Sequence, residues 1–351
     1  MATTMKEIAQ LAGVSIGTVD RALHNRGRVK PDVAQRIRKI AEELEYRPNS
    51  IAQGLFARSR SYRIAVIFHR KNIDTFFEDI LQGIEICKEE VSELGVTLDL
   101  FYGEDFSLDS QLKLLEQVEK DHYNALIIVP INHDSVKARI NGLYKQGIPV
   151  ILLSNIIDNC DFLSFVGCDY TRSGQIVAGF INMIHPGPGK LLYLSPPFQM
   201  MGHVMRARGL QERLATEYPH IQLSEICELH GSDVADYKLT KDVLARYPDT
   251  NLIVCPGAGS SGYMEAIEEF PGIAKSKIVS YDYSENTDRY IRNKIITATL
   301  VQHPKRQGYL AVKTAIGQLM DPQNFTVEKY QYLPTKLFFL ENLADINHWS
   351  I

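Results

Sequence analysis

The most constraining feature of this 351-residue sequence is a repeated alternation of short apolar runs and amphipathic segments that begins near Tyr62. Apolar runs such as 63–68, 125–131 and 149–154 have the length of buried strands, and 108–120 places apolar residues at helical spacing. Repeated units of this kind build parallel sheets whose two faces are covered by helices. The body of the chain therefore predicts an α/β fold.

The alternation continues through the second half of the body, which predicts two doubly wound lobes. Ligands of such lobes bind at the carboxyl ends of the strands. The expected strands cover 63–68, 97–101, 125–131, 149–154, 190–194, 252–255 and 277–281, and the expected helices cover 79–94, 108–120, 134–146, 175–184, 204–218, 235–247 and 262–269.

The first sixty residues predict an all-α head. Thr4 and Glu7 have capping-box spacing for a first helix that ends near residue 12. Gly13 supplies the permissive backbone of a tight turn, and Ser15 is placed to cap a second helix over 16–23. A helix, a glycine turn and a capped helix form a helix-turn-helix pattern.

A third helix closes this small core in the prediction. Pro31 suits its first turn, and its apolar stripe consists of Val33, Ile37, Ile40, Ala41 and Leu44. The first sixty residues hold 11 basic and 6 acidic side chains, whereas the whole chain has a net charge of −4. A basic head on an acidic body favours contact with a polyanion, and a solvated basic face without a partner is the plainer alternative.

The second helix is expected to enter the major groove of DNA, with Ile16, Gly17 and Arg21 on its exposed face. Arg21 could donate two hydrogen bonds to guanine or one to phosphate. Val19 and Leu23 are expected to point inward. Asp20 could orient the arginine, accept from a cytosine amino group, or simply face solvent.

The motifs Lys6-Glu-Ile-Ala-x-x-Ala-Gly-Val-Ser-x-x-Thr-Val-x-Arg21 and Leu44-x-Tyr-Arg-Pro-Asn-x-x-Ala52-x-x-Leu55 resemble the DNA-binding head and hinge of the LacI/GalR family of bacterial transcription regulators. The chain departs from the family pattern at Asp20 and Gly54. The resemblance implies a head over 1–46 and a hinge and linker over 47–61, in which Leu55 wedges into the minor groove. The residues expected to contact DNA are Thr4, Ser15, Ile16, Gly17, Thr18, Arg21, His24, Arg28, Asn49, Ala52 and Leu55.

The body is similar to periplasmic sugar-binding proteins in several short motifs, among them Phe76-Phe77, Met205-Arg206-x-Arg208-Gly209, Tyr281-Asp282 and Thr299-Leu-Val-Gln302. The resemblance implies a type I periplasmic-binding-protein architecture over 62–351, with one lobe of about 62–165 and 301–332 and the other of about 166–300 and 333–351. The expected effector-binding residues are Phe76, Phe77, Ser154, Asn155, Arg206, Gly257, Asp282 and Gln302. The pairs Ser154-Asn155 and Pro256-Gly257 replace polar pairs that are usual there, which argues against a plain pentose or hexose.

Each of these effector residues also has a structural alternative. The two phenylalanines could be core residues, Arg206 could form an ion pair between the lobes, and Asp282 could cap a helix. In addition, Gly257-Ala-Gly-Ser-Ser-Gly262 matches a dinucleotide fingerprint after a strand, with Asp282 about twenty residues beyond. The alternative function is therefore an NAD(P)-dependent oxidoreductase with a DNA-binding head. A milder alternative is that this glycine segment binds a phosphate or carboxylate of the effector.

The remaining features exclude other classes. Five dispersed cysteines predict reduced thiols and no disulfide or zinc framework. His69 and His203 could lie near the cleft, but we expect no metal and no cofactor. No apolar run approaches membrane-spanning length and no secretory signal is present, so a cytoplasmic location is expected. The predicted protein is a homodimeric repressor, not an enzyme, that binds operator DNA under the control of a sugar or sugar derivative, which could be anionic.

Overall fold

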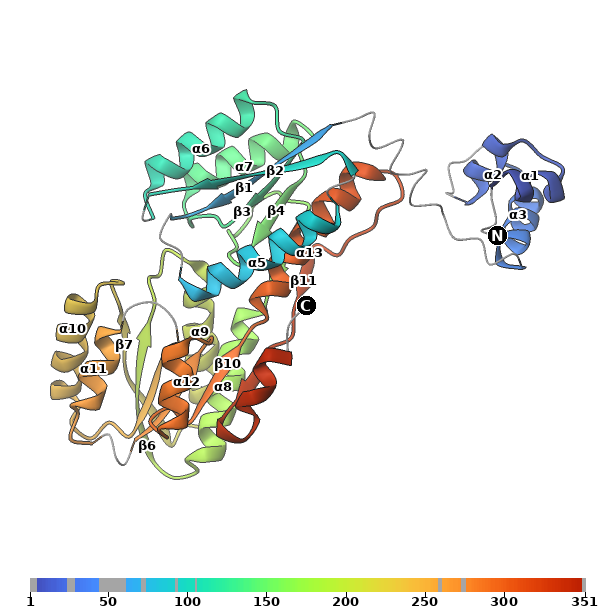
Figure 1. The fold of residues 1–351 in the computed structure, drawn as a ribbon. Helices are drawn as coiled ribbons and strands as arrows, with labels where there is room; N and C mark the ends of the chain where they lie inside the picture. The colour runs from blue at the N-terminus through green and yellow to red at the C-terminus, as the bar shows by residue number, and fades with distance from the viewer. Residues whose placement is uncertain are drawn as a thin grey trace. The chain divides into compact units, whose positions relative to one another are not determined.

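A computed structural model describes residues 5–23, 29–43, 61–70, 74–91, 94–104, 106–257, 261–272 and 276–348 (Figure 1). The chain divides into two compact units. The first unit contains the N-terminal helices together with 91–97 and 317–326, and the second contains nearly all of two sheets and their covering helices. Each unit is described by itself below.

Three helices form the head, and they begin where the sequence predicts. They are α1 (Met5–Ala12), α2 (Ile16–Leu23) and α3 (Pro31–Glu43). Gly13 has a φ of 64°, a left-handed conformation that suits glycine, and it makes the turn between α1 and α2. The Ser15 Oγ accepts a hydrogen bond of 3.2 Å from the Thr18 backbone N, which confirms the predicted cap of α2.

The core of the head is small and fully apolar. Ile8, Val19 and Ile37 are fully buried, one from each helix, and alanines fill the space between them. Val19 therefore points inward, as predicted. The Arg36 Nη2 donates to the carbonyl O of Ala12 at 2.9 Å. This hydrogen bond gives a partner to one of the carbonyl groups that have none within the helix at the end of α1.

The second unit contains a first sheet whose strand order is β11-β5-β4-β3-β1-β2. Its hydrogen-bonded pairs from β1 to β11 are parallel. We call this sheet and its helices lobe 1. Its elements are β1 (Tyr62–Phe68), α5 (Thr75–Glu90), β2 (Val96–Tyr102), α6 (Leu108–Lys120), β3 (Ala125–Ile128), α7 (Asp134–Lys145), β4 (Val150–Leu153), β5 (Ser164–Gly167), α13 (Pro304–Met320) and β11 (Tyr330–Tyr332).

The second sheet has the order β12-β10-β9-β8-β6-β7, and we call it and its helices lobe 2. Only its edge strand β12 is antiparallel to its neighbour among the described pairs. Its elements are α8 (Tyr170–Ile184), β6 (Gly189–Ser195), α9 (Met201–Glu217), β7 (Ile221–Glu228), α10 (Asp233–Arg246), β8 (Leu252–Pro256), α11 (Gly262–Glu268), β9 (Lys277–Tyr281), α12 (Glu285–Arg292), β10 (Ala298–Val301), β12 (Lys336–Phe338) and the 3₁₀ helix η3 (Leu340–His348).

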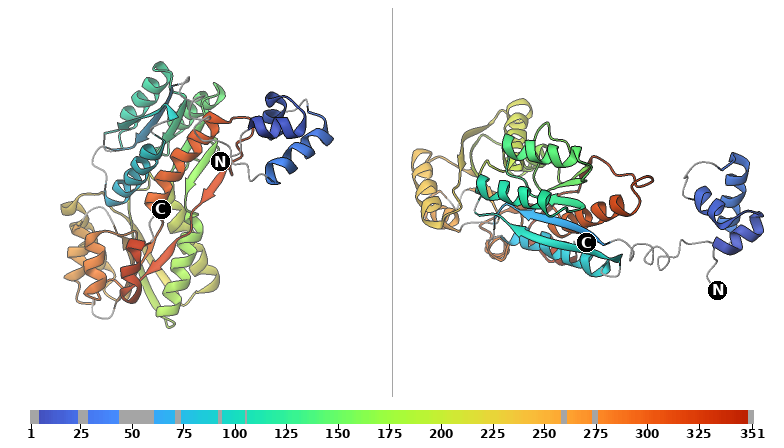
Figure 2. Two further views of the ribbon diagram at one scale, coloured as in Figure 1. Left: turned by 45° about the vertical axis from the view of Figure 1, so that its right-hand side comes forward. Right: turned by 90° about the horizontal axis from the view of Figure 1, so that it is seen from above.

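The chain passes between the two sheets three times, after β5, after β10 and after β11. Helices cover both faces of the lobe 1 sheet, with α6 and α7 on one face and α5 and α13 on the other (Figures 1 and 2). α5 and α13 approach closely because each places a glycine at the contact. A Cβ at Gly83 would lie 1.8 Å from the Lys305 carbonyl O, and one at Gly308 would lie 2.0 Å from that of Ile80.

Several boundaries differ from the sequence-based expectation. α5 begins at Thr75 instead of Asp79, because the Asp74 Oδ1 accepts the backbone N–H of Phe77 at 3.2 Å. α8 begins at Tyr170 instead of Gln175, since Asp169 caps it in the same way. The strands β5, β10, β11 and β12 were not predicted, and each has only three or four residues. The helices α12 and α13 were not predicted either.

Two further features concern membrane-spanning helices and disulfide bonds. Across the described ranges, no helix combines the length and the apolar character needed to cross a bilayer. All five cysteines lie in described segments, and they are buried and unpaired, which confirms the expectation of free thiols.

Candidate functional site

The exposed face of α2 carries a small polar cluster. The Ser15 Oγ lies 2.9 Å from the Thr18 Oγ1, and the Arg21 Nη2 donates to the same hydroxyl at 3.4 Å. Ser15, Gly17 and Arg21 are exposed, and Thr18 is partly exposed. These four predicted DNA contacts therefore lie on one accessible face, at the start of the helix that a helix-turn-helix protein inserts into the major groove.

The side chains of the other predicted DNA contacts lie outside the described residues. Ile16 belongs to α2, but its side chain lies outside the described residues, as does that of Asp20. The same is true of the whole of Thr4, His24, Arg28, Asn49, Ala52 and Leu55.

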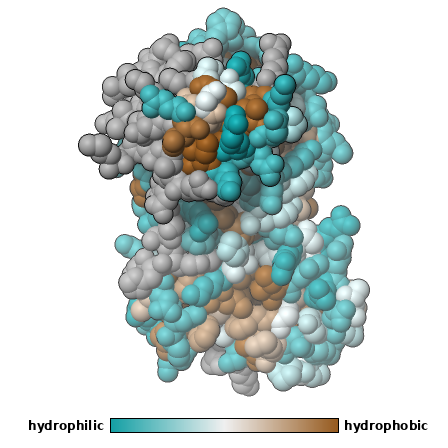
Figure 3. Space-filling view, turned by 90° about the vertical axis from the view of Figure 1, so that its right-hand side faces the viewer, coloured by the Kyte–Doolittle hydropathy of each residue, from teal (hydrophilic) through white to brown (hydrophobic). Residues whose placement is uncertain are grey.

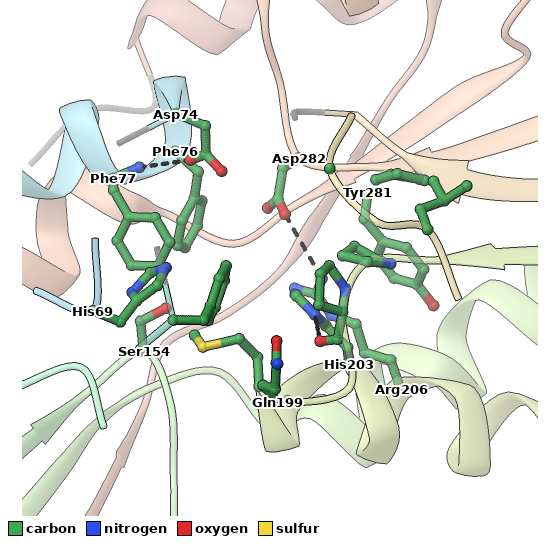
Figure 4. Close-up of a pocket in the computed structure, with 18 of the residues that line it drawn as sticks. His69, Asp74, Phe76, Phe77, Ser154, Gln199, His203, Arg206, Tyr281 and Asp282 are labelled. Atoms are coloured by element: carbon green, nitrogen blue, oxygen red, sulfur yellow. Dashed lines mark hydrogen bonds and ion pairs between the residues drawn. The ribbon is translucent and has the colours of Figure 1, made fainter. Parts of the chain in front are cut away.

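The second unit contains a cavity of about 420 Å³ at the carboxyl ends of strands from both lobes (Figure 4). This volume is within the usual range of small-molecule sites. Six of the eight predicted effector residues line it: Phe76, Phe77, Ser154, Arg206, Asp282 and Gln302. Lining residues that the sequence did not suggest include Arg70, Asp74, Phe106, Tyr170, Tyr193, His230, Asp236 and Tyr281.

Lobe 1 supplies the aromatic wall of the cavity. Phe76 and Phe77 lie in the first turn of α5 with ring centroids 5.2 Å apart and planes at 87°. They are only 8% and 6% exposed, so they belong both to the core and to the cavity wall. The imidazole of His69 packs between Phe77 and Phe106, with centroid distances of 4.8 and 4.4 Å.

Lobe 2 supplies a buried arginine. The guanidinium of Arg206, on α9, lies over the rings of Tyr281 at 4.5 Å and Tyr170 at 5.1 Å. Its Nη1 lies 3.6 Å from the Asp282 Oδ2. Burial opposes the charge of this side chain, but Asp282 and the neighbouring Cys168 and Tyr170 hold the Arg206 pKa above its ordinary value. The arginine therefore stays charged in the cavity wall.

Asp282 is held from two sides. It follows β9 with a φ of 66°, a strained conformation for a residue with a side chain. The Gln302 Nε2 donates to its Oδ1 at 2.7 Å, and the Cys168 Sγ donates to the Gln302 Oε1 at 3.2 Å. Burial raises the pKa of Asp282, while Arg206 and Gln302 oppose that rise.

Two histidines face the cavity from different lobes. Burial, assisted by Arg70 and by His203, lowers the pKa of His69 to about 3. Burial and Arg206 lower the pKa of His203 to about 4. The His203 Nδ1 lies 2.9 Å from the Pro197 carbonyl O. Since a carbonyl only accepts, Nδ1 is assigned the proton and Nε2 of the neutral ring is an acceptor.

Metal binding finds no support in the described residues, where no group of three or more His, Cys, Asp or Glu side chains is arranged to hold an ion.

The structure places Asn155 and Gly257 away from the cavity lining. The Asn155 side chain is fully buried and bridges the lobes: its Nδ2 donates to the Pro130 carbonyl O at 2.6 Å, and its Oδ1 accepts from the Gly202 N at 3.2 Å. The Gly257 carbonyl O accepts from the hydroxyls of Ser284 and Thr287, each at 2.7 Å. Both residues therefore support the site from outside.

The described part of the glycine-rich segment does not offer a free anion site. The Asp233 Oδ1 accepts the backbone N–H groups of Ser261 at 2.7 Å and Gly262 at 3.3 Å, so a carboxylate already occupies the start of α11. A Cβ at Gly262 would lie 1.9 Å from the Asp233 carbonyl O, and one at Gly257 would lie 2.2 Å from that of Tyr281. These glycines permit close packing, and Asp282 is engaged by Gln302 and Arg206. The dinucleotide interpretation is therefore wrong for the described residues.

Comparison with known proteins agrees with this architecture. Residues 4–49 match the model for bacterial regulatory proteins of the lacI family, and residues 64–322 match that for a periplasmic binding protein domain. The "Probable HTH-type transcriptional repressor ExuR" of Bacillus subtilis is 30% identical over 185 residues, 52% of each chain, so this match spans about half the length of the relative. The ribose operon repressor of Bacillus subtilis is 26% identical over 251 residues, 72% of each chain.

The fold of the second unit is also known from solved structures. GanP, a glucose-galactose binding protein from Geobacillus stearothermophilus, superposes with a TM-score of 0.72 at 20% identity, over 81% of this chain and 99% of its own. At that identity the likeness concerns the fold alone. With a matching head, a matching body and the two-lobed structure in place, the chain belongs to the LacI family of bacterial transcription regulators, which are not enzymes, and carries a periplasmic-binding-protein-like effector domain.

Proposed function

We propose that this protein is a repressor that binds operator DNA through α2 of its head, and that its affinity for operator changes when a small effector binds in the cavity. The observation that carries the proposal is the cavity itself, whose wall is shared by two lobes. A ligand that contacts both lobes has different affinity for different lobe arrangements, and that difference is the source of allosteric control.

The effector in this proposal is a sugar or a sugar derivative. Aromatic side chains on lobe 1 and convergent hydrogen-bonding groups on lobe 2 suit a ring that carries several polar substituents. The names of similar proteins support this class, since they include a ribose operon repressor and a glucose-galactose binding protein. Anionic derivatives fall within it.

We also propose that the protein acts as a homodimer. A dimer would place two heads on the half-sites of a pseudo-palindromic operator. Apolar side chains at the surface support a second copy as partner: Tyr332 is 50% exposed and stacks on Tyr330 in the edge strand β11, and Met183 is 75% exposed. Figure 3 shows apolar surface in several places on the face that it draws, interrupted by hydrophilic side chains. Binding to operator DNA would place this dimer in the cytoplasm.

The test of the DNA-binding half uses operator duplexes selected from a random pool and fluorescence anisotropy. Leu55→Ala should weaken operator binding without changing effector binding, because the wedge role implied by the family resemblance is confined to DNA. An operator affinity equal to that of the unaltered protein would remove the wedge from the proposal. Sedimentation equilibrium at micromolar concentration tests the dimer, and a monomer bound to full operator would contradict it.

The test of the effector half compares two arginines of the same helix. Arg206→Ala should abolish the response of operator binding to effector, because the guanidinium lines the cavity. Arg208→Ala is the matched control, since that side chain is exposed and pairs with Glu212 at 2.6 Å. Equal effector isotherms for the two variants would exclude Arg206 from the site.

A further inference from the structure

A count of the charged side chains that line the cavity gives a misleading indication of the charge of its ligand. Asp74, Asp236 and Asp282 line it, against Arg70 and Arg206. Three carboxylates and two guanidinium groups would suggest a neutral or cationic ligand. The hydrogen bonds that these groups already make lead to a different conclusion.

Every cavity carboxylate already accepts hydrogen bonds from this chain. Both oxygens of Asp74 and of Asp236 already have a donor from this chain, whereas Asp282 accepts one hydrogen bond, at Oδ1. Asp74 accepts from the Arg70 Nη2 at 2.8 Å and the Phe77 N at 3.2 Å, Asp236 accepts from the His230 N at 2.7 Å and the Gly231 N at 3.1 Å, and Asp282 accepts from the Gln302 Nε2 at 2.7 Å.

Two arginine donors of the cavity and one histidine nitrogen, in contrast, have no partner within the described part of the chain. Among the described residues the Nε atoms of Arg70 and Arg206 and the Nδ1 of His69 are buried without a hydrogen-bond partner. The shortest contact of Arg206 with a carboxylate is 3.6 Å, which exceeds a hydrogen bond. Buried donors of this kind are normally satisfied, so the ligand is expected to bring acceptors.

The unused donors are gathered around the two histidines. His69 adjoins Arg70 at the end of β1, and His203 precedes Arg206 by one turn of α9. In Figure 4, Asp74 and Asp282 lie toward one side of the cavity, and His69 and His203 lie toward the other. Asp74 raises the pKa of Asp282, whereas His203 lowers that of His69, so each pair is close enough to interact.

We infer, on the basis of the proposed function, that the effector is a sugar acid whose carboxylate lies between His69 of lobe 1 and His203 of lobe 2, beside Arg70 and Arg206. One proton is taken up from solvent when it binds. The proton goes to an imidazole nitrogen and the carboxylate stays ionised, so an ion pair replaces a neutral ring. The sugar hydroxyls then face Asp282 and Gln302. Because the two histidines come from different lobes, the carboxylate would hold both lobes at once.

The proton uptake follows from the groups that face the histidines. Arg70 and His203 disfavour a charge on His69, and Arg206 disfavours one on His203, so both rings are neutral before ligand binds. Asp74 does not offset this, since it is paired with Arg70. A carboxylate placed between the rings supplies the missing negative charge and favours the imidazolium form.

Isothermal titration calorimetry on the full chain tests this inference with D-gluconate, D-glucuronate and D-galacturonate as acids and D-glucose and D-galactose as neutral sugars. Titrations at pH 6 and pH 8, each in two buffers of different ionisation enthalpy, measure the protons taken up. We expect at least one acid to bind with uptake of about one proton and with up to tenfold higher affinity per unit fall in pH. The neutral sugars should bind at least tenfold more weakly.

Two variants and a control assign the effect to the histidines. His203→Asn keeps a side-chain donor for the Pro197 carbonyl but loses Nε2, and His69→Gln removes the other ring. Each should lower acid affinity at least tenfold, and loss of the ring that takes up the proton should abolish the uptake. His185→Gln is the matched control, because that ring also contacts a proline carbonyl, Pro188 O at 3.0 Å, but lies outside the cavity lining. Far-UV circular dichroism confirms that each variant is folded.

The outcomes separate this inference from the function on which it rests. Tight binding of neutral sugars with weak binding of acids would overturn the carboxylate and leave a sugar effector standing. Acid binding without proton uptake, or unaltered in both histidine variants, would overturn the role of the histidines. If neither class binds at millimolar concentration or changes operator affinity, the sugar effector of the proposed function fails as well.

Discussion

His69 gives the sharpest stability prediction, because its ring is 1% exposed and its pKa of about 3 lies far below the ordinary value of 6.5. Between these values the unfolded chain binds a proton that the folded chain does not, so the free energy of unfolding falls as the pH falls. For a single group with these two pKa values, the loss relative to neutral pH is about 1.3 kcal/mol at pH 5.5 and about 3 kcal/mol at pH 4.

Replacement of the ring by methionine should remove that loss. We expect the difference in unfolding free energy between His69→Met and the unaltered protein to grow by about 3 kcal/mol from pH 7.5 to pH 4, in favour of the variant. Urea unfolding followed by circular dichroism at 222 nm, repeated at each pH, measures the difference. His185→Gln is the control for loss of a histidine outside the cavity. Parallel curves for His69→Met and the unaltered protein would refute the assignment of a buried neutral imidazole.

Three further predictions test the packing that supports the two sites. Ile37→Ala should destabilise the head by about 2–5 kcal/mol and abolish operator binding while leaving calorimetric ligand binding intact, since Ile37 is fully buried in the head core; normal operator binding would contradict it. Gly262→Ala should lower the melting temperature by forcing a Cβ against Asp233, whereas Gly142→Ala, which meets nothing within 4 Å, should not; equal shifts in a thermal melt would dismiss the packing role. Asn155→Ala should cost about 1–3 kcal/mol for each buried group that it leaves unpaired, and an unchanged urea midpoint would show that the bridge between the lobes is replaceable.

The architecture could be predicted from the sequence because its signals are local and strong. Helix α6 occupies Leu108–Lys120 and strand β9 occupies Lys277–Tyr281, and both agree with the expected ranges residue for residue. The missed strands are different. β5, β10, β11 and β12 have three or four residues each, and β11 exists as a strand only because it pairs with β5, more than 160 residues earlier. Such pairing leaves no periodic pattern in either segment.

The site was predictable where a motif marked a strand end, and less so elsewhere. Asp282 follows β9 directly, and Arg206 lies on the helix that follows β6. The prediction of a dinucleotide site at the glycine segment was wrong because glycine spacing alone does not distinguish a loop that binds phosphate from a segment that packs closely against neighbouring backbone. Asp233, which fills the start of α11, lies nearly thirty residues earlier in the chain, so local spacing carried no sign of it.

The role of the histidines was also beyond the sequence. A histidine after a strand is compatible with core, surface or cavity. The deciding facts are that His69 packs between two aromatic rings and that His203 is fixed by the Pro197 carbonyl. Both depend on chain segments brought together only by the fold.

The late pairing of β11 with β5 has a consequence for synthesis on the ribosome. β5 ends at Gly167, and the strand that covers its outer edge ends at Tyr332, so 165 further residues must be translated before the pair can form. At about 5–20 residues per second, that interval lasts about 8–33 s. Throughout it the nascent chain would expose the backbone donors and acceptors of a buried apolar strand, a template for pairing with neighbouring chains on the same messenger RNA. Slowing translation beyond residue 167 should therefore increase aggregation, and early binding of a chaperone to this edge should reduce it.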